Sequence, residues 1–396
     1  MGALQSFDVA VIGLGAMGSS AAYHLARRGK RVLGIEQFGP AHDQGSSHGQ
    51  SRIIRQAYFE GEAYVALLLR AYELWDQLQH DTGQHLLTIT GGLFLGPPDS
   101  QVFSGSRASA VAHGLAHEVL GAAEIHARFP PLRPPQHFAG LYEARAGVLD
   151  PEGSVRTALS AADRLGASLK FHETVREITP LGEDAGVRIT TPQGAYLAAR
   201  AVVAAGPWTG HFLPDLQLPL SVKRMVMHWF RPRGHAEDFL PDRFPIHIWQ
   251  LDDGLMFYGF PAADARAEGV KVALHNRNML PCTPATIDRS VHEDEVEAMR
   301  ALMAAYLPDL DGEHADARTC MYTMTPDEAF IIDVHPLWPS IALAAGFSGH
   351  GFKFASVVGE VLADLACDGA TRHDIRLFAL NRFQNRGEHD KPSDVR

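Results

Sequence analysis

Short apolar runs alternate with amphipathic segments at the start of the chain. Residues 7–12 form a short run rich in Val and Ile, which is typical of a strand buried in a parallel sheet. Residues 19–28 carry small apolar side chains at helical spacing, and Gly29 follows where a helix commonly ends. Residues 31–36 indicate a second strand. The pattern therefore predicts a strand, a glycine turn, a helix and a strand.

The remaining pattern indicates two domains, each built from separated segments. The expected helices are 64–78, 152–165 and 355–366, and the expected strands are 169–171, 186–191, 201–205, 330–332 and 341–345. Around residues 86–95 the pattern is strand-like. Residues 97–146, which are mixed in pattern and rich in Pro and Gly, and residues 220–320 interrupt this alternation. We expect an α/β protein with one domain from 1–88, 150–219 and 321–385, a second from 89–149 and 220–320, and a polar tail over 386–396.

Composition and charge exclude several classes of protein. The net charge of −11 over 396 residues argues against a protein that binds duplex nucleic acid. We find neither an apolar run of the roughly 18–20 residues that span a bilayer nor a signal peptide, so we expect a cytoplasmic protein. Three cysteines give no disulfide framework, and we expect Cys282 and Cys367 to be small buried side chains. No Cys/His cluster has zinc-like spacing, so we expect no metal.

The sequence GLGAMG at residues 13–18 matches the dinucleotide motif G-x-G-x-x-G between a predicted strand and a predicted helix. The first glycine permits a tight turn, the second lets the backbone approach a pyrophosphate, and the third lets helix and strand pack closely. The helix N-terminus offers free N–H groups to phosphates. Glu36, at the end of the second strand, is placed to accept hydrogen bonds from ribose hydroxyls. The motif alone does not separate NAD from FAD.

A basic, glycine- and serine-rich segment follows at residues 45–55. One arginine of this segment could stabilise negative charge on a reduced flavin, and another could hold a substrate carboxylate with two hydrogen bonds. The candidates are Arg52 and Arg55. A solvated basic turn explains the residue types equally well.

Five longer motifs make the interpretation more specific. They are GSSHGQSRIIRQAY at 45–58, YGFP at 258–261, Lys271 with His275, CMYTMTPDEAFIID at 320–333 and GFSGHGFKFASVVGE at 346–360. In these segments the chain resembles the family of monomeric sarcosine oxidase and N-methyltryptophan oxidase, and the resemblance runs in order from about residue 7 to about residue 383. The chain departs from the family pattern at Ser47, where a second histidine is common, and at Gln50-Ser51, where Asp-Thr is common.

The resemblance implies a role for each matching residue. Cys320 matches the cysteine that forms a thioether to the 8α-methyl group of FAD, and a thiolate is the natural nucleophile for that bond. Arg55 and Lys353 match the pair that binds the substrate carboxylate. The expected catalytic residues are Lys271, credited with oxygen activation, Arg52 over the flavin, His48 beside it, and the pocket residues Tyr258, His275 and Tyr322, of which Tyr258 and Tyr322 also contact substrate. The expected cofactor-binding residues are Gly13, Gly15, Ala16, Met17, Gly18, Glu36, Ser46, Ser47, His48, Arg52, Val175, Cys320, Gly346, Gly349, Gly351, Phe352 and Lys353.

The resemblance also implies the fold and the reaction. We expect a Rossmann-like FAD-binding domain, and a substrate domain with an antiparallel sheet. The implied reaction is hydride transfer from a small N-methyl amino acid to covalently bound FAD, with O₂ as acceptor and H₂O₂ as product. We expect a monomer with no nucleic-acid, membrane or metal partner. The open alternatives are an oxidase of N-methyltryptophan, a cyclic imino acid or a glycated amino acid, a dehydrogenase with another acceptor, and a non-enzymatic flavin protein.

Overall fold

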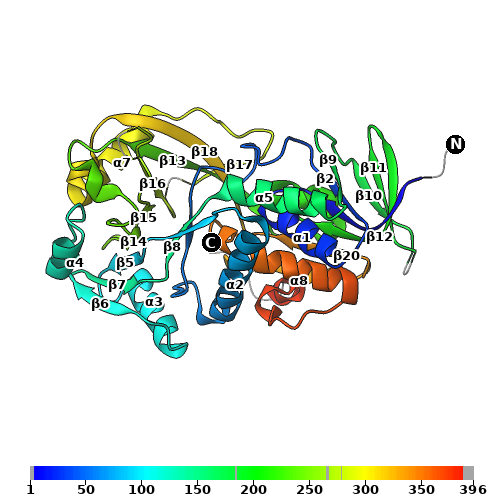
Figure 1. Cartoon of the computed structure of the whole chain (residues 1–396), viewed down its shortest axis with the longest axis horizontal. Coiled ribbons are helices and arrows are strands. Elements are labelled where there is room, and N and C mark those ends of the chain that lie inside the picture. The colour runs from blue at the N-terminus through cyan, green and yellow to red at the C-terminus, as the bar shows by residue number, and fades with distance from the viewer. Residues whose placement is uncertain (1–3, 183–184, 265–266, 278, 387–396) are drawn as a thin grey trace, which may run out of the picture. The chain divides into compact units, whose positions relative to one another are not determined.

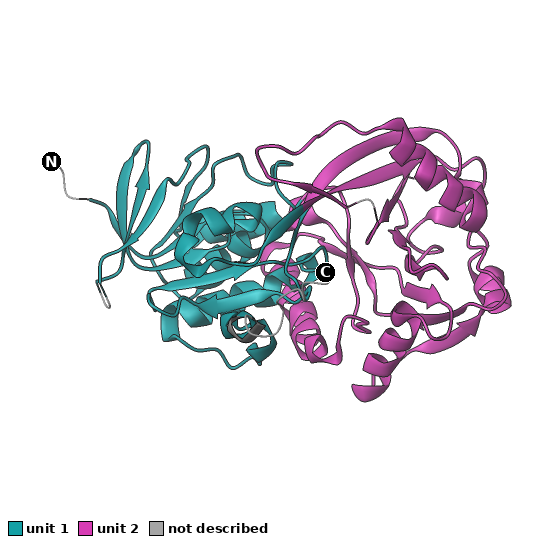
Figure 2. Cartoon of the chain, turned by 180° about the vertical axis from the view of Figure 1, so that it is seen from behind, with its two compact units in different colours: residues 1–47, 155–222, 322–396 teal, residues 48–154, 223–321 magenta. Residues whose placement is uncertain are grey.

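The computed structural model describes residues 4–182, 185–264, 267–277 and 279–386. The chain divides into two compact units, coloured separately in Figure 2: unit 1 holds residues 1–47, 155–222 and 322–396, and unit 2 holds 48–154 and 223–321. Nearly all of the expected polar tail lies outside the described residues.

Unit 1 is built on a mixed sheet with strand order β10-β11-β12-β1-β2-β9, extended by β20 beside β12 and by β19. Its strands are β1 (Ser6–Ile12), β2 (Val32–Ile35), β9 (Ser168–Lys170), β10 (Glu177–Pro180), β11 (Val187–Thr191), β12 (Gly194–Val203), β19 (Ile331–Val334) and β20 (Ile341–Ala345). The pairs β1·β2, β1·β12, β2·β9 and β12·β20 are parallel. Val and Ile side chains at the centre of β1 are buried, as the apolar run predicts.

Helices α1 (Ala16–Arg27) and α8 (Ala355–Asp368) pack against each other within unit 1, where Figure 1 shows them side by side. A Cβ atom on Gly359 would lie only 2.2 Å from Ser20 Oγ. The glycine in α8 therefore permits the close approach of the two helices. A further helix, α6, spans Thr209–Phe212.

Unit 2 contains a nine-stranded sheet of order β17-β13-β16-β15-β14-β5-β7-β6, with β18 paired to β13, and a small sheet β3-β8-β4. The strands are β3 (Arg52–Ile54), β4 (Leu87–Ile89), β5 (Gly92–Gly96), β6 (Glu118–Gly121), β7 (Ala139–Glu143), β8 (Gly147–Leu149), β13 (Ser221–Phe230), β14 (Ile246–Gln250), β15 (Met256–Gly259), β16 (Val270–Leu274), β17 (Leu280–Cys282) and β18 (His314–Met324). The helices are α2 (Val65–Thr82), α3 (Gln101–Ala112), α4 (Ala122–Arg128) and α7 (Glu293–Tyr306). The chain passes between the units within α5 (Pro151–Arg164), β13 and β18.

Strand register places the residues of interest on one face of the large sheet. In the antiparallel pairs, Lys271 lies opposite Trp229, and Tyr258 lies opposite Ala273. Because directly opposed residues share a face and side chains alternate along a strand, Lys271 and Tyr258 point to the same side. The intervening residues Val270 and Val272 point to the other side, where they join an apolar core.

The predicted fold class is confirmed. The large sheet of unit 2, expected to be antiparallel, contains the parallel pair β14·β5 among antiparallel pairs, and one domain boundary is wrong. Residues 48–88, expected in the first domain, belong to unit 2, because β3 and β4 both pair with β8. The strand-like pattern around residues 86–95 is confirmed as two strands, β4 and β5, which lie in different sheets because Gly91 between them has a φ of +73° and turns the chain. Among the described residues, no helix is long and apolar enough to cross a membrane.

Candidate active site

The glycine loop of unit 1 follows β1 and begins α1. Gly13 has a φ of +85°, and a Cβ atom there would lie 2.7 Å from the Ala204 carbonyl oxygen. A Cβ atom on Gly18 would lie 1.8 Å from the Gly13 oxygen. Packing of the chain therefore requires both glycines. At Gly15, by contrast, the one atom of the described residues beyond its chain neighbours that would lie within 4 Å of a Cβ atom is Ser47 Oγ, at 3.4 Å, so the missing side chain leaves room for a ligand.

Glu36 ties the end of β2 to this loop. Its carboxylate accepts hydrogen bonds from the N–H groups of Leu14 at 2.9 Å and Phe38 at 3.1 Å, and it lies 3.4 Å from His42 Nε2. Burial alone would raise the pKa of Glu36, but the hydrogen bonds from His42 and Leu14 outweigh it and the pKa is lowered. An ionised carboxylate at this position suits the hydroxyl groups of a ribose. The Ala16 N–H, at the start of α1, donates to Ser47 Oγ at 3.1 Å.

A second glycine-rich turn of unit 1 lies between β20 and α8. Cβ atoms on Gly346, Gly349 and Gly351 would lie within 2.5 Å of Thr325, Tyr322 and Phe347, respectively. These contacts account for the three glycines by the packing of this chain, without a ligand. The turn brings Tyr322 against Gly349.

Two further candidates of unit 1 lie in different surroundings. Lys353 is almost fully buried, and its Nζ donates to the His350 carbonyl oxygen at 2.7 Å. Val175 is buried in the apolar core of the sheet with Ile35. Ala16 and Met17 are buried in the first turn of α1, and Ser46 and Phe352 are half-buried.

In unit 2, residues 48–52 form a tight loop with two consecutive residues of positive φ, Gly49 at +108° and Gln50 at +66°. Arg52 folds back on this loop. Its Nη2 donates to the His48 carbonyl oxygen at 2.5 Å and its Nη1 donates to the Ser51 carbonyl oxygen at 2.9 Å. The basic segment is therefore a hydrogen-bonded loop that fixes its own arginine, and not a solvated turn.

Lys271 donates hydrogen bonds to the same loop. The Nζ donates to the carbonyl oxygens of Gly49 at 2.7 Å and Ser51 at 2.9 Å, and the side chain is only 3% exposed. It also lies 4.8 Å from the Phe260 ring centroid and 5.5 Å from that of Trp229, both of which are buried. Burial, reinforced by the neighbouring charge of Arg52, lowers the pKa of Lys271 well below its usual value.

Cys320, on β18, lies close enough to Arg52 and Lys271 for their charges to act on it. Burial raises the pKa of the Cys320 thiol, and the charges of Arg52 and Lys271 oppose that rise. The structure therefore brings these three predicted residues of unit 2 together. Cys282 and Cys367 were expected to be buried but are only half-buried, because each lies near the end of its element.

Arg55 has a partner that the sequence did not reveal. Its guanidinium is 1% exposed, and Nη2 donates to both carboxylate oxygens of Glu60, at 2.7 and 2.5 Å. Nη1 donates to the Ala57 carbonyl oxygen at 2.8 Å, and the rings of Tyr58 and Phe59 lie 4.1 and 4.3 Å away. A substrate carboxylate at Arg55 must therefore replace Glu60, or reach the Nε atom, which is buried and has no hydrogen-bond partner among the described residues.

Tyr258 and His275 extend the sheet face that carries Lys271. Their ring centroids lie 6.4 Å apart, nearly perpendicular, and the Tyr258 ring lies 5.8 Å from that of Phe260. Since Phe260 also contacts the ammonium of Lys271, the three predicted residues share one aromatic-lined surface within unit 2.

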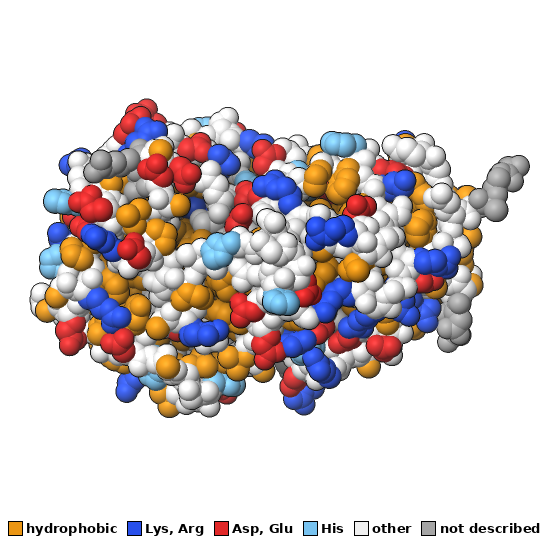
Figure 3. Space-filling view, in the orientation of Figure 1, with side chains coloured by type: hydrophobic (Ala, Val, Ile, Leu, Met, Phe, Trp, Pro, Cys, Tyr) orange, Lys and Arg blue, Asp and Glu red, His pale blue; other side chains and the backbone are white. Residues whose placement is uncertain are grey.

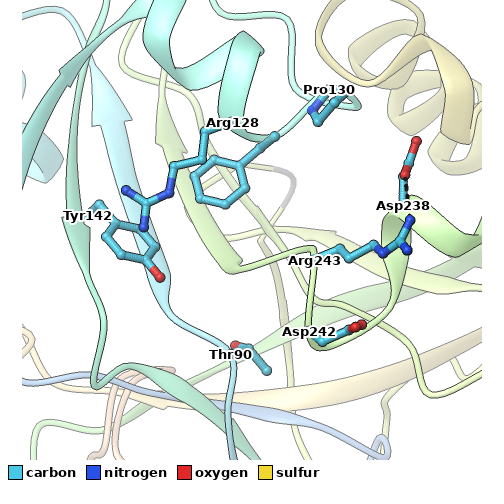
Figure 4. Close-up of a pocket in the computed structure, with 8 residues that line it drawn as sticks. Thr90, Arg128, Pro130, Tyr142, Asp238, Asp242 and Arg243 are labelled. Atoms are coloured by element: carbon cyan, nitrogen blue, oxygen red, sulfur yellow. Dashed lines mark ion pairs between the residues drawn. The ribbon is translucent and has the colours of Figure 1, made fainter.

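A cavity of about 370 Å³ in unit 2 contains none of the predicted residues. Figure 4 shows Arg128 beside Tyr142 on one side, and Arg243 paired with Asp238 on the other. Among the described residues, no group of three or more His, Cys, Asp or Glu could hold a metal ion. On the face drawn in Figure 3, basic and acidic side chains are interspersed among the described residues.

A family model described as FAD dependent oxidoreductase matches residues 8–365. The chain belongs to this family. Monomeric sarcosine oxidase of Streptomyces avermitilis is 49% identical over 379 residues, which are 96% of this chain and 98% of that protein. N-methyl-L-tryptophan oxidase of Salmonella enteritidis PT4 is 37% identical, covering 96% of this chain and 100% of that protein. The solved structure of NikD, described as an unusual amino acid oxidase, has a TM-score of 0.83 at 27% identity, covering 95% of this chain and 97% of that chain.

The resemblance read from the motifs is therefore confirmed, and the chain is an FAD-dependent oxidoreductase. The residues of unit 1 fit this cofactor, because among the described residues only Ser47 Oγ comes near a Cβ atom on Gly15, at 3.4 Å, and the lowered pKa of Glu36 keeps its carboxylate ionised next to the loop. Sequence reasoning missed Glu60, which pairs with Arg55. It also missed Glu152, whose carboxylate accepts the N–H of Gly49 in the loop that binds Lys271. An acidic residue five positions after Arg55 was the one signal available for Glu60.

Proposed function

We propose that this FAD-dependent oxidoreductase oxidises a small N-methyl amino acid of the sarcosine type, with O₂ as electron acceptor. When bound, FAD accepts a hydride from the N-methyl carbon and returns the electrons to O₂, which becomes H₂O₂. The imine that leaves takes up water and splits into formaldehyde and the demethylated amino acid. The similarity to several sarcosine oxidases supports the substrate class.

The surroundings of Lys271 support O₂ as the electron acceptor. The first electron transferred to O₂ makes superoxide, and a fixed cation lowers the barrier to forming that anion. Lys271 offers an ammonium that is buried, directed by two carbonyl oxygens and flanked by aromatic rings. A surface lysine would lose most of this effect to solvent screening.

The substrate carboxylate is proposed to bind Arg55 and Lys353. At Arg55 the exchange replaces one carboxylate, that of Glu60, by another, so the guanidinium keeps a bidentate partner throughout. Such an exchange avoids leaving a buried cation without a counter-charge, which is the costly alternative. Orientation of the N-methyl group that follows is worth several kcal/mol, about 7–11 at the ideal limit.

Cys320 is proposed to bond covalently to the 8α-methyl group of FAD. Thioether formation needs the thiolate, and the charges of Arg52 and Lys271 favour that form against burial. Acid precipitation of the purified protein tests this directly. The proposal predicts a yellow pellet from the wild type and a colourless pellet with yellow supernatant from Cys320→Ser. A colourless wild-type pellet refutes the bond.

Oxygen consumption tests the acceptor. Sarcosine added to the air-saturated enzyme should consume O₂ and release equal amounts of H₂O₂ and formaldehyde without any added acceptor. Turnover that depends on an added quinone or carrier would instead indicate a dehydrogenase.

The similarity to N-methyl-L-tryptophan oxidase favours an aromatic N-methyl amino acid as the second candidate substrate. A panel that includes sarcosine, N-methyltryptophan, pipecolate and a glycated amino acid, read by H₂O₂ release, separates the candidates. We also propose a monomer in the cytoplasm. Gel filtration of the purified chain tests the first, and a fluorescent fusion in its own host tests the second.

A further inference from the structure

Lys271 is directed by backbone rather than by an acidic side chain. Its two hydrogen-bond acceptors are the carbonyl oxygens of Gly49 and Ser51, on a loop whose residues Gly49 and Gln50 both have positive φ. Gln50 is in a conformation that a non-glycine residue rarely adopts. Within the loop the Ser51 N–H donates to the Gly49 carbonyl oxygen at 2.7 Å, and a contact from outside the loop holds the same backbone.

Glu152 supplies that stabilisation. Its Oε1 accepts the Gly49 N–H at 2.7 Å, and its two oxygens accept the Gln50 N–H at 3.2 and 3.1 Å. Two successive N–H groups thus hold one carboxylate, an arrangement that suits an anion. Glu152 also lies in the first turn of α5, where the helix dipole favours a negative charge. Burial would raise the pKa of Glu152, but the bonds from Gly49 and Gln50 outweigh it and the pKa is lowered.

One peptide group lies between the Glu152 carboxylate and the Lys271 ammonium and is hydrogen-bonded to both. The Gln50 N–H and the Gly49 carbonyl belong to the same planar unit, and among the described residues no peptide is cis, so the two groups point in opposite directions. The N–H faces the Glu152 carboxylate, and the carbonyl oxygen faces the Lys271 ammonium. Aligned in this way, the peptide dipole is polarised by both charges, and each hydrogen bond strengthens the other.

We propose that Glu152 is a positioning residue for Lys271: its carboxylate fixes the peptide between residues 49 and 50 and so directs the carbonyl oxygen that holds the ammonium. This inference rests on the proposed role of Lys271 in the reaction with O₂. It assigns a function to an acid that acts on the ammonium through the intervening peptide.

The charges around Lys271 give the direction of the expected effect. Arg52 and Arg318 disfavour the ammonium, whereas Glu152 favours it. Removal of the Glu152 charge therefore lowers the pKa of Lys271 further below its usual value. The ammonium is then lost at a lower pH than in the wild type, and any rate that depends on it falls at lower pH.

The test compares Glu152→Gln with the wild type by stopped flow from pH 6 to 10. We expect the rate constant for reoxidation of the reduced enzyme by O₂ to fall about tenfold at neutral pH, as loss of one charge-assisted hydrogen bond implies. The midpoint of its pH profile should move to lower pH, while anaerobic reduction by sarcosine keeps its rate. Hydrogen exchange at the amides of Gly49 and Gln50, which needs neither cofactor nor turnover, should accelerate.

Two further variants complete the experiment. Glu124→Gln is the matched control, because Glu124 also lies in the first turn of a helix of unit 2 and accepts a backbone N–H, that of Gly121 at 2.7 Å. It should leave the reoxidation rate and its midpoint unchanged. Glu152→Asp keeps the charge one methylene further away, so the pH midpoint should stay near that of the wild type with a smaller loss of rate. If Glu152→Gln does not fold, the rate and pH midpoint of Glu152→Asp are compared with those of the wild type instead.

The outcomes separate the inference from the proposed function. If Lys271→Met slows reoxidation but Glu152→Gln keeps the wild-type rate, midpoint and amide exchange, the role of Glu152 is wrong and that of Lys271 stands. If Lys271→Met leaves reoxidation unchanged, the proposed role of Lys271 fails, and the inference fails with it. A loss of flavin reduction equal to the loss of reoxidation would indicate a general structural role and would also overturn the inference.

Discussion

Replacement of Lys271 by Met removes one buried charge and keeps an unbranched side chain of similar length. The variant loses two charge-assisted hydrogen bonds, each worth about 1.5–3 kcal/mol of folding free energy. Neither acceptor is left unsatisfied, because the Gly49 carbonyl oxygen keeps the Ser51 N–H at 2.7 Å and the Ser51 carbonyl oxygen keeps Arg52 Nη1 at 2.9 Å. Removal of an ammonium that is only 3% exposed relieves a desolvation penalty of several kcal/mol. These terms oppose each other, so we expect the melting temperature to change little.

The reaction with O₂ should change far more than the stability. A unit charge about 4 Å from superoxide, at an effective dielectric constant of about 20, contributes about 4 kcal/mol. This corresponds to a decrease of about a thousandfold in the reoxidation rate constant. Flavin reduction by substrate involves no such anion at O₂ and should change by less than about tenfold.

Stopped flow separates the two half-reactions. The reduced enzyme, prepared anaerobically with sarcosine, is mixed with buffers of increasing O₂ content, and recovery of the yellow colour is followed. Lys223→Met, on β13 of the same sheet, is a suitable control that should reoxidise as the wild type does. Equal reoxidation rates for Lys271→Met and the wild type would refute the reasoning.

The pH profile of the wild type provides a second check on Lys271. Because burial lowers its pKa well below 10.5, the ammonium is present at low pH and is lost before an exposed lysine would lose it. The reoxidation rate constant should therefore fall as the pH rises, with a midpoint below 10.5. A rate that is constant up to pH 10 would contradict a charged Lys271 as the active form.

Two other predictions follow from the packing. Glu60→Gln removes the carboxylate that pairs with the buried guanidinium of Arg55, so the free energy of unfolding should fall by about 2–3 kcal/mol. Saturating acetate should raise the melting temperature of this variant more than that of the wild type. An equal rise in both proteins would contradict carboxylate exchange at Arg55. Gly18→Ala should prevent stable folding, since its Cβ atom would lie 1.8 Å from the Gly13 oxygen, whereas Gly15→Ala should fold and lose FAD affinity, because its nearest neighbour is 3.4 Å away. Far-ultraviolet circular dichroism with flavin content distinguishes the two glycines, and a Gly15→Ala protein with full flavin would count against a cofactor at this loop.

The sequence predicted features that depend on neighbouring residues. The turn of the glycine loop, the helix after it and the acid at the end of β2 follow from local conformational preference and spacing, and the structure has all three. The strand-like pattern around residues 86–95 is confirmed as well, and the turn at Gly91, which has a positive φ, divides it into β4 and β5.

Features that depend on distant residues could not be predicted from the pattern. Residues 48–88 were assigned to the wrong unit, since only the pairing of β3 with β8, about a hundred residues later, places them. Glu152 is 103 residues from Gly49 in sequence and carries no motif of its own. The pattern of residues along one sequence does not indicate that Glu152 and Gly49 are in contact. The roles of Lys271 and Cys320 came from the family resemblance, because neither a lone lysine nor a lone cysteine indicates a function.

The central claim is that the chain binds FAD and passes to it a hydride from an N-methyl amino acid. The most direct measurement is the absorbance spectrum of the purified protein during anaerobic titration with sarcosine and, separately, with N-methyltryptophan. We predict the visible absorbance band of an oxidised flavin, which bleaches with at least one of these substrates and returns when O₂ is admitted. A protein that carries no flavin, or a flavin band that no secondary amino acid bleaches, would contradict the account.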